Sequence, residues 1–421
     1  MYVADSRGTP AAPADAARAP GRRSAVAPTV FALGTVSLIT DVSSEMVTAV
    51  LPLYLVTGLG LSPLGFGLLD GVYNGFSALV RLVGGHLADR GGRHKAVAVL
   101  GYGVSALCKP LLLIAGSLPV IGAVLAADRT GKGLRTAPRD ALISLASAPE
   151  SRGRAFGVHR AMDTAGAMLG PLTAFLILRQ AADGYDAVFT VSFCVAAVGV
   201  LVLLLFVPSR TPLAPPVEGA PRASLRAALA LLRIRDVRQL TLCAFLLGLA
   251  TVSDSFVYLL LQHRLGVPDR WFALLPLGTA AAFLVLAVPL GRLADRVGRR
   301  RVFLGGHLAL LLAYALLLTG WHGAALPFLV LALHGGFYAA TDGVLMAAAA
   351  GSVPAALRSS GLALLQTAQA LARFACSLAF GAAWTAWGDR TALGTAAATL
   401  TVCAAVAFLL RPVNSPEVER P

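Results

Sequence analysis

Charged residues are scarce in this sequence. Of its 421 residues, 13% are Asp, Glu, Lys or Arg and 57% are hydrophobic, whereas a soluble domain carries about 25% charged residues. So few charges leave too little polar surface to cover a water-facing globule of this length. An ordinary soluble protein is therefore excluded.

The sequence also lacks clusters of metal-binding or nucleotide-binding residues. Its five cysteines lie far apart inside apolar stretches, and its seven histidines include no His-x-x-x-His pair, a spacing typical of zinc sites. Gly131-Lys132 lacks the first glycine of a nucleotide-binding loop. We therefore expect no metal, no cofactor, no step driven by ATP and no enzymatic activity.

Long apolar runs are what the sequence does have. They are roughly 20 residues long, which is enough for a helix to cross a hydrocarbon core of about 30 Å, and lipid favours helices because their backbone groups pair internally. Twelve spans are predicted, at residues 29–56, 64–87, 96–116, 118–142, 154–178, 187–207, 239–263, 270–292, 301–320, 323–349, 358–386 and 391–411. We expect an all-α integral membrane protein.

The placement of the arginines predicts the orientation. They gather at the ends of every second apolar run, as at Arg90 and Arg93, while loops such as 57–62 are nearly uncharged. This alternation is typical of the positive-inside rule. It predicts a multi-pass protein of the inner (plasma) membrane with both termini in the cytoplasm. The net charge of +14 is thus a topology signal in a lipid bilayer, and nucleic acid is not an expected partner.

A repeated motif divides the chain into two halves. Gly85-His-Leu-Ala-Asp89-Arg-Gly-Gly-Arg93 recurs as Gly291-Arg-Leu-Ala-Asp295-Arg-Val-Gly-Arg299, with an offset of 206 residues (291 − 85). The same offset brings Arg152 onto Arg358. We expect two pseudo-symmetric six-helix bundles in one chain that works as a monomer. The predicted parts are a disordered tail at 1–27, bundles at 28–207 and 239–411, a cytoplasmic linker at 208–238 and a tail at 412–421.

This motif resembles the signature of the major facilitator superfamily, at the expected places after the second and eighth spans. In the fourth span, Arg129-Thr-Gly-Lys-Gly133 resembles a motif of proton-coupled drug exporters. The longer run from Asp128 to Asp140 is similar to a subgroup of poorly characterised bacterial and archaeal permeases. The resemblance implies twelve helices in two bundles that carry a small solute by alternating access.

Two further features follow from the resemblance. In the fifth span, Gly166-Ala-Met-Leu-Gly170-Pro171 resembles the glycine-proline motif of antiporters, although Thr173 and Ala174 replace the glycine pair that usually ends it. The repeated motif implies a latch on the cytoplasmic side. Its residues are Gly85, Asp89 and Arg93, with Gly291, Asp295 and Arg299 as the second copy. Alternatively, these charges only set the topology.

The fourth span carries a charged stripe. Asp128, Lys132 and Arg135 lie within about 60° of one helix face, and Arg129 adjoins them. A charge in the hydrocarbon costs at least about 2.5–3.5 kcal/mol, so these side chains should face a cleft or partners. Opposite charges are available on other predicted spans: Asp41 and Glu45 in the first, and Arg160 with Asp163, one turn apart, in the fifth.

The second half is less charged at matching positions. The 206-residue offset maps Asp128 and Lys132 onto His334 and Tyr338 in the tenth span, and it maps Arg160 and Asp163 onto Gln366 and Gln369. Arg373 follows one turn later, and Asp254 and Asp342 are the conspicuous acids. Two interpretations stay open: contacts with the solute, or ordinary polar contacts between helices.

The function predicted from these features is proton-coupled efflux of a small solute. Asp41, Glu45 and Asp128 are the candidate proton carriers, because a partly dry cleft favours the protonated carboxyl. Arg129, Asp163, Asp254 and Asp342 complete the coupling and ion-pair set. The predicted solute contacts are Lys132, Arg135, Arg160, His334, Tyr338, Gln366, Gln369 and Arg373. Alternatives are uptake or exchange of an organic anion held by Lys132, Arg135 and Arg160, and a transport-inactive receptor or lipid-handling protein.

Overall fold

The described residues are almost entirely helical. The computed structural model describes residues 27–74, 80, 94–147, 152–181, 184–208, 230–321, 323–352 and 358–409. Most of the predicted N-terminal tail and cytoplasmic linker lies outside these ranges. The helices follow the predicted apolar runs, with ends that differ by a few residues.

The first half begins with a helix whose end is irregular. α1 (Pro28–Leu53) starts with a proline in its first turn, where the missing amide hydrogen is not needed. A second proline, Pro52, lies near its end and is followed by a π-helix, η1 (Tyr54–Gly58). Because Pro52 cannot donate to the preceding turn, the hydrogen-bond ladder changes its register here.

The remaining helices of the first half match five predicted spans. A helix at 63–74 covers the described part of the predicted span 64–87. The others are α3 (His94–Ile114), α4 (Leu118–Leu145), α5 (Arg152–Gln180) and α6 (Gly184–Phe206). α4 carries its six charged side chains within a single helix of 28 residues.

The second half contains the corresponding helices. A short 3-10 turn, η3 (Leu231–Arg233), precedes the first of them. The others are α8 (Arg235–Leu249), α9 (Asp254–Leu265), α10 (Asp269–Phe272), α11 (Leu275–Val297), α12 (Arg299–Leu318), α13 (Leu326–Ser352) and α14 (Arg358–Leu409). α14 joins the last two predicted spans across a break at Gly388, whose φ of 82° suits glycine.

The predicted seventh span, 239–263, is broken, which the sequence did not indicate. α8 ends at Leu249 and α9 begins at Asp254. The hydroxyl of Tyr314 accepts a hydrogen bond from the Val252 amide at 2.8 Å and donates to the Ala250 carbonyl at 3.4 Å. These bonds satisfy backbone groups that the interruption frees, as a membrane interior requires. The predicted span is present at Val237–Leu265, but it consists of two helices with an interruption at 250–253.

The two halves repeat the same arrangement. Arg152 lies in α5, and Arg358, at the 206-residue offset of the sequence repeat, lies in α14. In the first half α1 packs on α5, and α3 packs on α4; in the second, α8 packs on α14, and α12 packs on α13. The sequence repeat is therefore a repeat of helix packing.

Many of these helices have the length and composition of membrane spans. Eight stretches of the described chain are long and apolar enough to cross a bilayer, among them Pro28–Gly58, Gly184–Phe206 and the 46-residue stretch Leu364–Leu409 that contains the break at Gly388. The chain is thus a multi-pass membrane protein built from helices.

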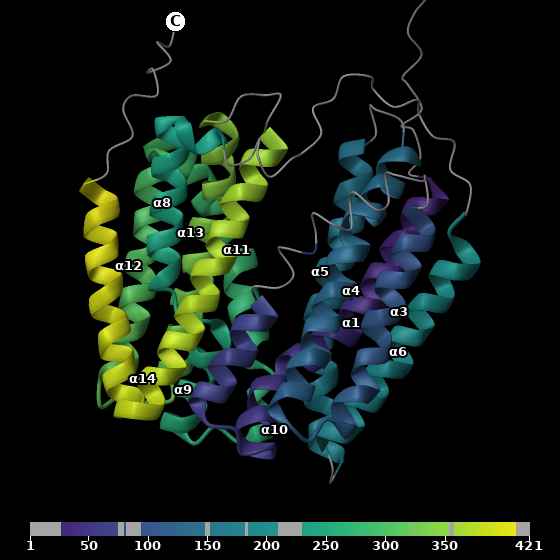
Figure 1. Ribbon diagram of the computed structural model, residues 1–421, viewed down its shortest axis with the longest axis horizontal. Coiled ribbons are helices and arrows are strands. Elements are labelled where there is room, and N and C mark those ends of the chain that lie inside the picture. Colours follow the sequence, from purple (N-terminus) through teal and green to yellow (C-terminus); the bar gives the residue numbers. More distant parts are fainter. Residues whose placement is uncertain are drawn as a thin grey trace, which may run out of the picture.

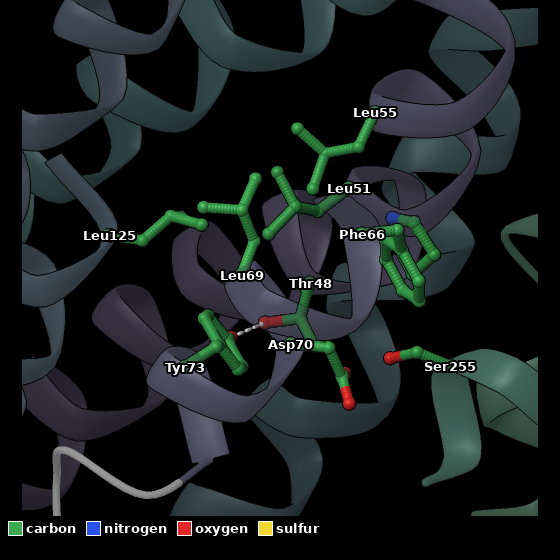
Figure 2. Close-up of a pocket in the computed structure, with 10 residues that line it drawn as sticks. Thr48, Leu51, Leu55, Phe66, Leu69, Asp70, Tyr73, Leu125 and Ser255 are labelled. Carbon is green, nitrogen blue, oxygen red and sulfur yellow. Dashed lines mark hydrogen bonds between the residues drawn. The ribbon is translucent and has the colours of Figure 1, made fainter. Parts of the chain in front are cut away.

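The two bundles meet at one end. In Figure 1 they approach each other where α9 and α10 lie and part towards the opposite end. α5 contacts α10 and α11, and α1 contacts α9 and α10. At this closed end the Leu64 amide donates to Thr385 Oγ1 at 3.0 Å, and Asp70 and Ser255 face each other across the halves (Figure 2).

Candidate functional site

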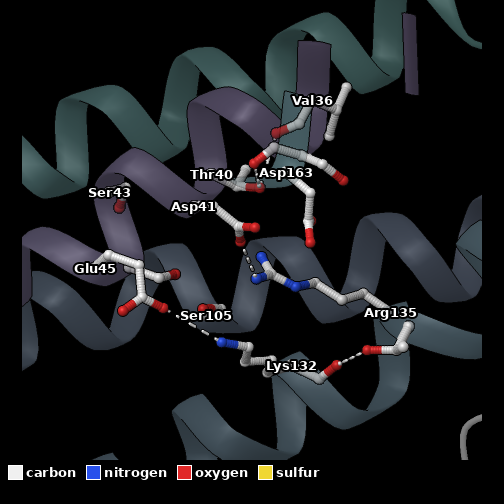
Figure 3. A network of polar contacts seen from close by, with 12 residues as sticks. Val36, Thr40, Asp41, Ser43, Glu45, Ser105, Lys132, Arg135 and Asp163 are labelled. Atoms are coloured by element: carbon white, nitrogen blue, oxygen red, sulfur yellow. Dashed lines mark hydrogen bonds and ion pairs between the residues drawn. The ribbon is translucent and has the colours of Figure 1, made fainter. Parts of the chain in front are cut away.

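Two ion pairs join the middle of α1 to the middle of α4. Arg135 Nη2 lies 3.5 Å from Asp41 Oδ1, and Lys132 Nζ lies 3.6 Å from Glu45 Oε1. Figure 3 shows both basic side chains reaching from α4 to the carboxylates of α1. The structure therefore brings together the acidic and basic stripes of the first and fourth spans.

The two pairs differ in exposure. The side chains of Arg135 and Asp41 are 4% and 13% exposed, whereas those of Lys132 and Glu45 are 35% and 27% exposed. Arg135 also stacks on the ring of Tyr102, 4.4 Å from its centroid. Because a charge avoids lipid, the partial exposure of the Glu45–Lys132 pair at mid-span indicates a water-accessible space beside it.

Asp128 lies between two cations. Its Oδ1 accepts from Lys109 Nζ at 2.8 Å, and its Oδ2 accepts from Arg129 Nη2 at 2.6 Å. Ser105 Oγ adds a third hydrogen bond at 2.6 Å, and the Arg129 guanidinium lies 3.8 Å from the ring centroid of Tyr73. All available acceptor positions of this carboxylate face donors, so it is held as the anion of a buried cluster.

A third cluster lies near the other end of α4. Arg139 contacts Asp163 of α5 at 3.6 Å and its neighbour Asp140 at 3.1 Å. Arg160 lies 3.4 Å from the same Asp163, one turn away, and its side chain is 79% exposed. Asp163 thus joins two basic residues, and Arg160 is the outer member of the cluster.

The second half has its own polar cluster, between α9 and α13. The Tyr338 hydroxyl donates to Asp254 Oδ1 at 2.5 Å. His334 Nε2 lies 3.4 Å from the same oxygen but is not aligned for a hydrogen bond, and this histidine is fully buried. Asp254 is 41% exposed. It occupies the first turn of α9, where the helix dipole favours a negative charge.

Arg373 extends this cluster from α14. Its guanidinium lies 5.9 Å from the ring centroid of Tyr338, and it interacts electrostatically with Asp342 and Asp254. Asp342 is exposed although it lies within α13. Gln366 and Gln369 precede Arg373 at helical spacing on the same side of α14. Asp254, His334, Tyr338, Asp342 and Arg373 therefore share one region.

The glycines of the fifth span face α1. A methyl group on Gly166 would overlap the carbonyl oxygen of Leu38, and one on Gly170 would come 2.7 Å from Glu45 Cβ and 2.9 Å from the Val42 carbonyl oxygen. These glycines let α5 approach the helix that carries Asp41 and Glu45.

The predicted latch is described in its second copy. Gly291 and Asp295 lie in the last turns of α11, and Arg299 opens α12 after Gly298, whose φ is 98°. Asp295 is exposed. The first copy, Gly85, Asp89 and Arg93, lies outside the described residues.

The Asp128 cluster contains side chains that are not among the predicted site residues. Lys109 and Ser105 of α3 and Tyr73 of the helix at 63–74 complete the Asp128 cluster. A lysine in the middle of a span is itself a signal, since it needs a partner away from lipid. No pattern in the sequence pointed to Tyr73, because its contact with Arg129 depends on how two distant helices pack.

The sequence of this chain is similar to those of known proteins. A sequence model of the Major Facilitator Superfamily matches residues 33–285 and 240–421. An uncharacterized MFS-type transporter of Methanocaldococcus jannaschii is 30% identical over 367 residues, which cover 84% of this chain and 88% of the relative. An uncharacterized protein of Mycobacterium tuberculosis is 38% identical over 184 residues, or 44% of each chain.

Solved structures with similar folds belong to transporters. The nucleoside transporter NupG has a TM-score of 0.79 at 14% identity, covering 91% of this chain and 98% of its own. A bacterial homolog of the human lysosomal transporter Spinster, inward-facing and unoccupied, has a TM-score of 0.75 at 16% identity, covering 91% and 96%. At such identities the likeness concerns the fold alone.

Proposed function

The chain belongs to the Major Facilitator Superfamily and is a secondary transporter, and from this premise we propose that it exports a small solute in exchange for protons. The observation that carries the proposal is the pair of mid-span contacts Asp41–Arg135 and Glu45–Lys132. In each, protonation of the carboxyl would release a cation inside the protein, so that proton binding changes the charge of the central space.

Asp41 and Glu45 are better suited to carry the proton than Asp128. Their contacts of 3.5 and 3.6 Å are longer than a tight charged hydrogen bond, and each involves one basic partner. Asp128 has two basic partners at 2.8 and 2.6 Å. Protonating it would leave two buried cations without a counter-ion, which is unfavourable. We assign Asp128 a structural role and Asp41 and Glu45 the coupling role.

Uptake or exchange of an organic anion held by Lys132, Arg135 and Arg160 is less well supported. Each of these three residues already has a carboxylate partner. An anion would have to displace those partners. The partly exposed Asp254, with Asp342 and Tyr338 near it and the buried His334 packed on Tyr338, instead offers negative charge and an aromatic face. We propose that it contacts the solute and that Gln369 and Arg373 border it.

The direction and orientation belong to the same proposal. The exporter-like segment Arg129–Gly133 and the glycine motif of α5 favour outward transport coupled to proton entry. The alternation of arginines favours an inner (plasma) membrane protein with cytoplasmic termini. The end at which the bundles meet would then face the outside, and the parted end would face the cytoplasm.

Proton flux in proteoliposomes tests the proposal. With an imposed pH gradient, addition of ethidium or tetraphenylphosphonium as cationic probes, or benzoate as an anionic one, should collapse the gradient if the probe is exchanged for protons. A fluorescent dye inside the vesicles reports the collapse. We expect a response to at least one cation, and its loss in Asp41→Asn or Glu45→Gln.

The matched control is Asp186→Asn, which removes an exposed carboxylate at the start of α6, away from the network. It should keep the response of the parent protein. Full solute-driven collapse in both network variants would refute the assigned coupling residues. Solute flux that ignores the pH gradient in the parent protein would refute proton exchange.

A further inference from the structure

A buried carboxyl group outside the charged network joins the two halves. Asp70, in the helix at 63–74, is 5% exposed, and Ser377 of α14 is 1% exposed. Ser377 Oγ lies 2.7 Å from Asp70 Oδ2, and Asn74 Nδ2 donates to Oδ1 at 3.2 Å. The carboxyl is therefore part of the contact that holds the closed end together.

The surroundings of Asp70 are mostly apolar. Figure 2 shows it at the edge of a pocket whose lining includes Leu51, Leu55, Phe66 and Leu69. The cavity is small, about 20 Å³. Such an environment disfavours a charge that has no partner.

Within the described part of the chain, Asp70 has no basic partner. The titratable groups that act on it from packed helices are Asp254 of α9, which repels a negative charge, and the thiol of Cys376 of α14. Two cations lie nearby but face elsewhere. Arg373 interacts with Asp254, Asp342 and Tyr338, and Arg129 covers the ring of Tyr73.

A proton on Asp70 has an acceptor within reach. The hydroxyls of Ser253 and Ser255, at the broken segment between α8 and α9, face its carboxyl group. Ser253 Oγ is buried and has no hydrogen-bond partner among the described residues. The Ser253 hydroxyl can accept a hydrogen bond from the protonated carboxyl or donate one to the ionised carboxylate, so it accommodates both forms. Burial without a cation is what disfavours the charged form.

The helices around Asp70 pack closely against one another. A methyl group on Gly67 would overlap the carbonyl oxygen of Ser377, and one on Gly381 would overlap that of Pro63. The rings of Phe66 and Phe256 meet edge to face with centroids 4.9 Å apart. We call this contact between the helix at 63–74, α9 and α14 the seal.

We propose that Asp70 is a proton-binding site whose protonated form closes the seal. When the halves separate at this end, water reaches the carboxyl group and stabilises its ionised form. The closed state then binds the proton more tightly than the open state, so by linkage a lower pH favours closure. This inference deepens the proposed exchange with protons and rests on it for the role of closure in transport.

Cys376 provides a reporter, because it is 5% exposed and precedes Ser377 in the seal. In a background with Cys108, Cys194, Cys243 and Cys403 replaced by serine, its rate of labelling by a maleimide is measured in lipid nanodiscs. The variant Asp70→Asn has a neutral side chain at every pH. Its labelling rate therefore gives the pH dependence of the Cys376 thiol alone. The labelling rate of Cys376 in the parent background, divided by its rate in Asp70→Asn, should rise about tenfold from about pH 5 to about pH 8.

Two further variants keep the test decisive. Ser377→Ala removes the bond across the halves and should raise labelling severalfold at about pH 5. Asp186→Asn should keep the parent profile. A ratio of labelling rates that stays constant with pH would overturn the proposal. A labelling rate that depends on Na⁺ concentration at fixed pH and ionic strength would also overturn it, because it would indicate a metal-cation site.

The labelling experiment uses no transported solute, so the two proposals can fail separately. A constant ratio together with intact proton-driven flux would refute only the seal. A pH-dependent ratio without proton-driven flux would refute only the exchange and leave Asp70 as a pH-dependent gate.

Discussion

At the scale of single residues, the first half contains ion pairs of two kinds. Asp128 is enclosed by Lys109, Arg129 and Ser105. Glu45 and Lys132 are separated by 3.6 Å and are partly exposed. A buried charge without its partner is strongly destabilising, while an exposed pair contributes little. The enclosed ion pairs of Asp128 therefore stabilise the fold, whereas the Glu45–Lys132 pair can break at little cost in stability.

Asp128→Asn should lower the stability by roughly 3–5 kcal/mol, because it leaves two buried cations without a counter-ion. Glu45→Gln should lower it by less than about 1 kcal/mol. The measurement is thermal unfolding of the detergent-purified protein, followed by intrinsic fluorescence. The double variant Asp128→Asn with Lys109→Met should recover part of the loss. Equal unfolding midpoints for Asp128→Asn and Glu45→Gln would contradict this division.

At the scale of helices, the packing of α5 on α1 places the coupling residues. Gly166 and Gly170 lie one turn apart on the face of α5 that meets α1. Their lack of side chains brings the backbone of α5 next to Val42 and Glu45. The antiporter-like motif thus has a physical role, which is to set the distance between two helices.

Gly170→Ala should destabilise the protein by about 1–3 kcal/mol, since the added methyl group has to push α1 and α5 apart. Gly157→Ala on the same helix is the matched control, because a methyl group there meets nothing within 4 Å. It should be neutral or stabilise by up to about 1 kcal/mol through helix propensity. The same unfolding assay compares them, and equal effects of the two variants would show that the close approach does not matter.

At the scale of the whole molecule, two repeated bundles touch at one end. Alternating access requires this contact to open while the opposite ends approach. The broken segment at 250–253 and the Asp70 contact both lie where the halves meet. The polarity of the chain decides which side of the membrane this end faces.

Cysteine labelling in intact cells tests that polarity. With the native cysteines replaced by serine, Thr57→Cys at the exposed end of η1 should react with a membrane-impermeant maleimide added outside. Arg301→Cys, exposed in the first turn of α12, should react only after the cells are opened. The opposite labelling pattern would reverse the proposed orientation and would place the seal on the cytoplasmic side of the membrane.

The sequence by itself determined the class of protein, the positions of most spans and the two-fold repeat. These follow from apolar runs of fixed length and from a repeated motif, and each of these signals lies in contiguous residues of the chain. It also indicated that Asp128, Lys132 and Arg135 need partners, because their charge is costly in lipid wherever the helix packs.

Only the tertiary structure decided which partners meet. It placed Asp128 against Lys109, broke the seventh span where Tyr314 could satisfy the free backbone groups, and buried Asp70 against Ser377. Each of these depends on contacts between different helices. A periodic pattern gives the face of a helix but not the residue that the face meets, because that depends on how all the helices pack together.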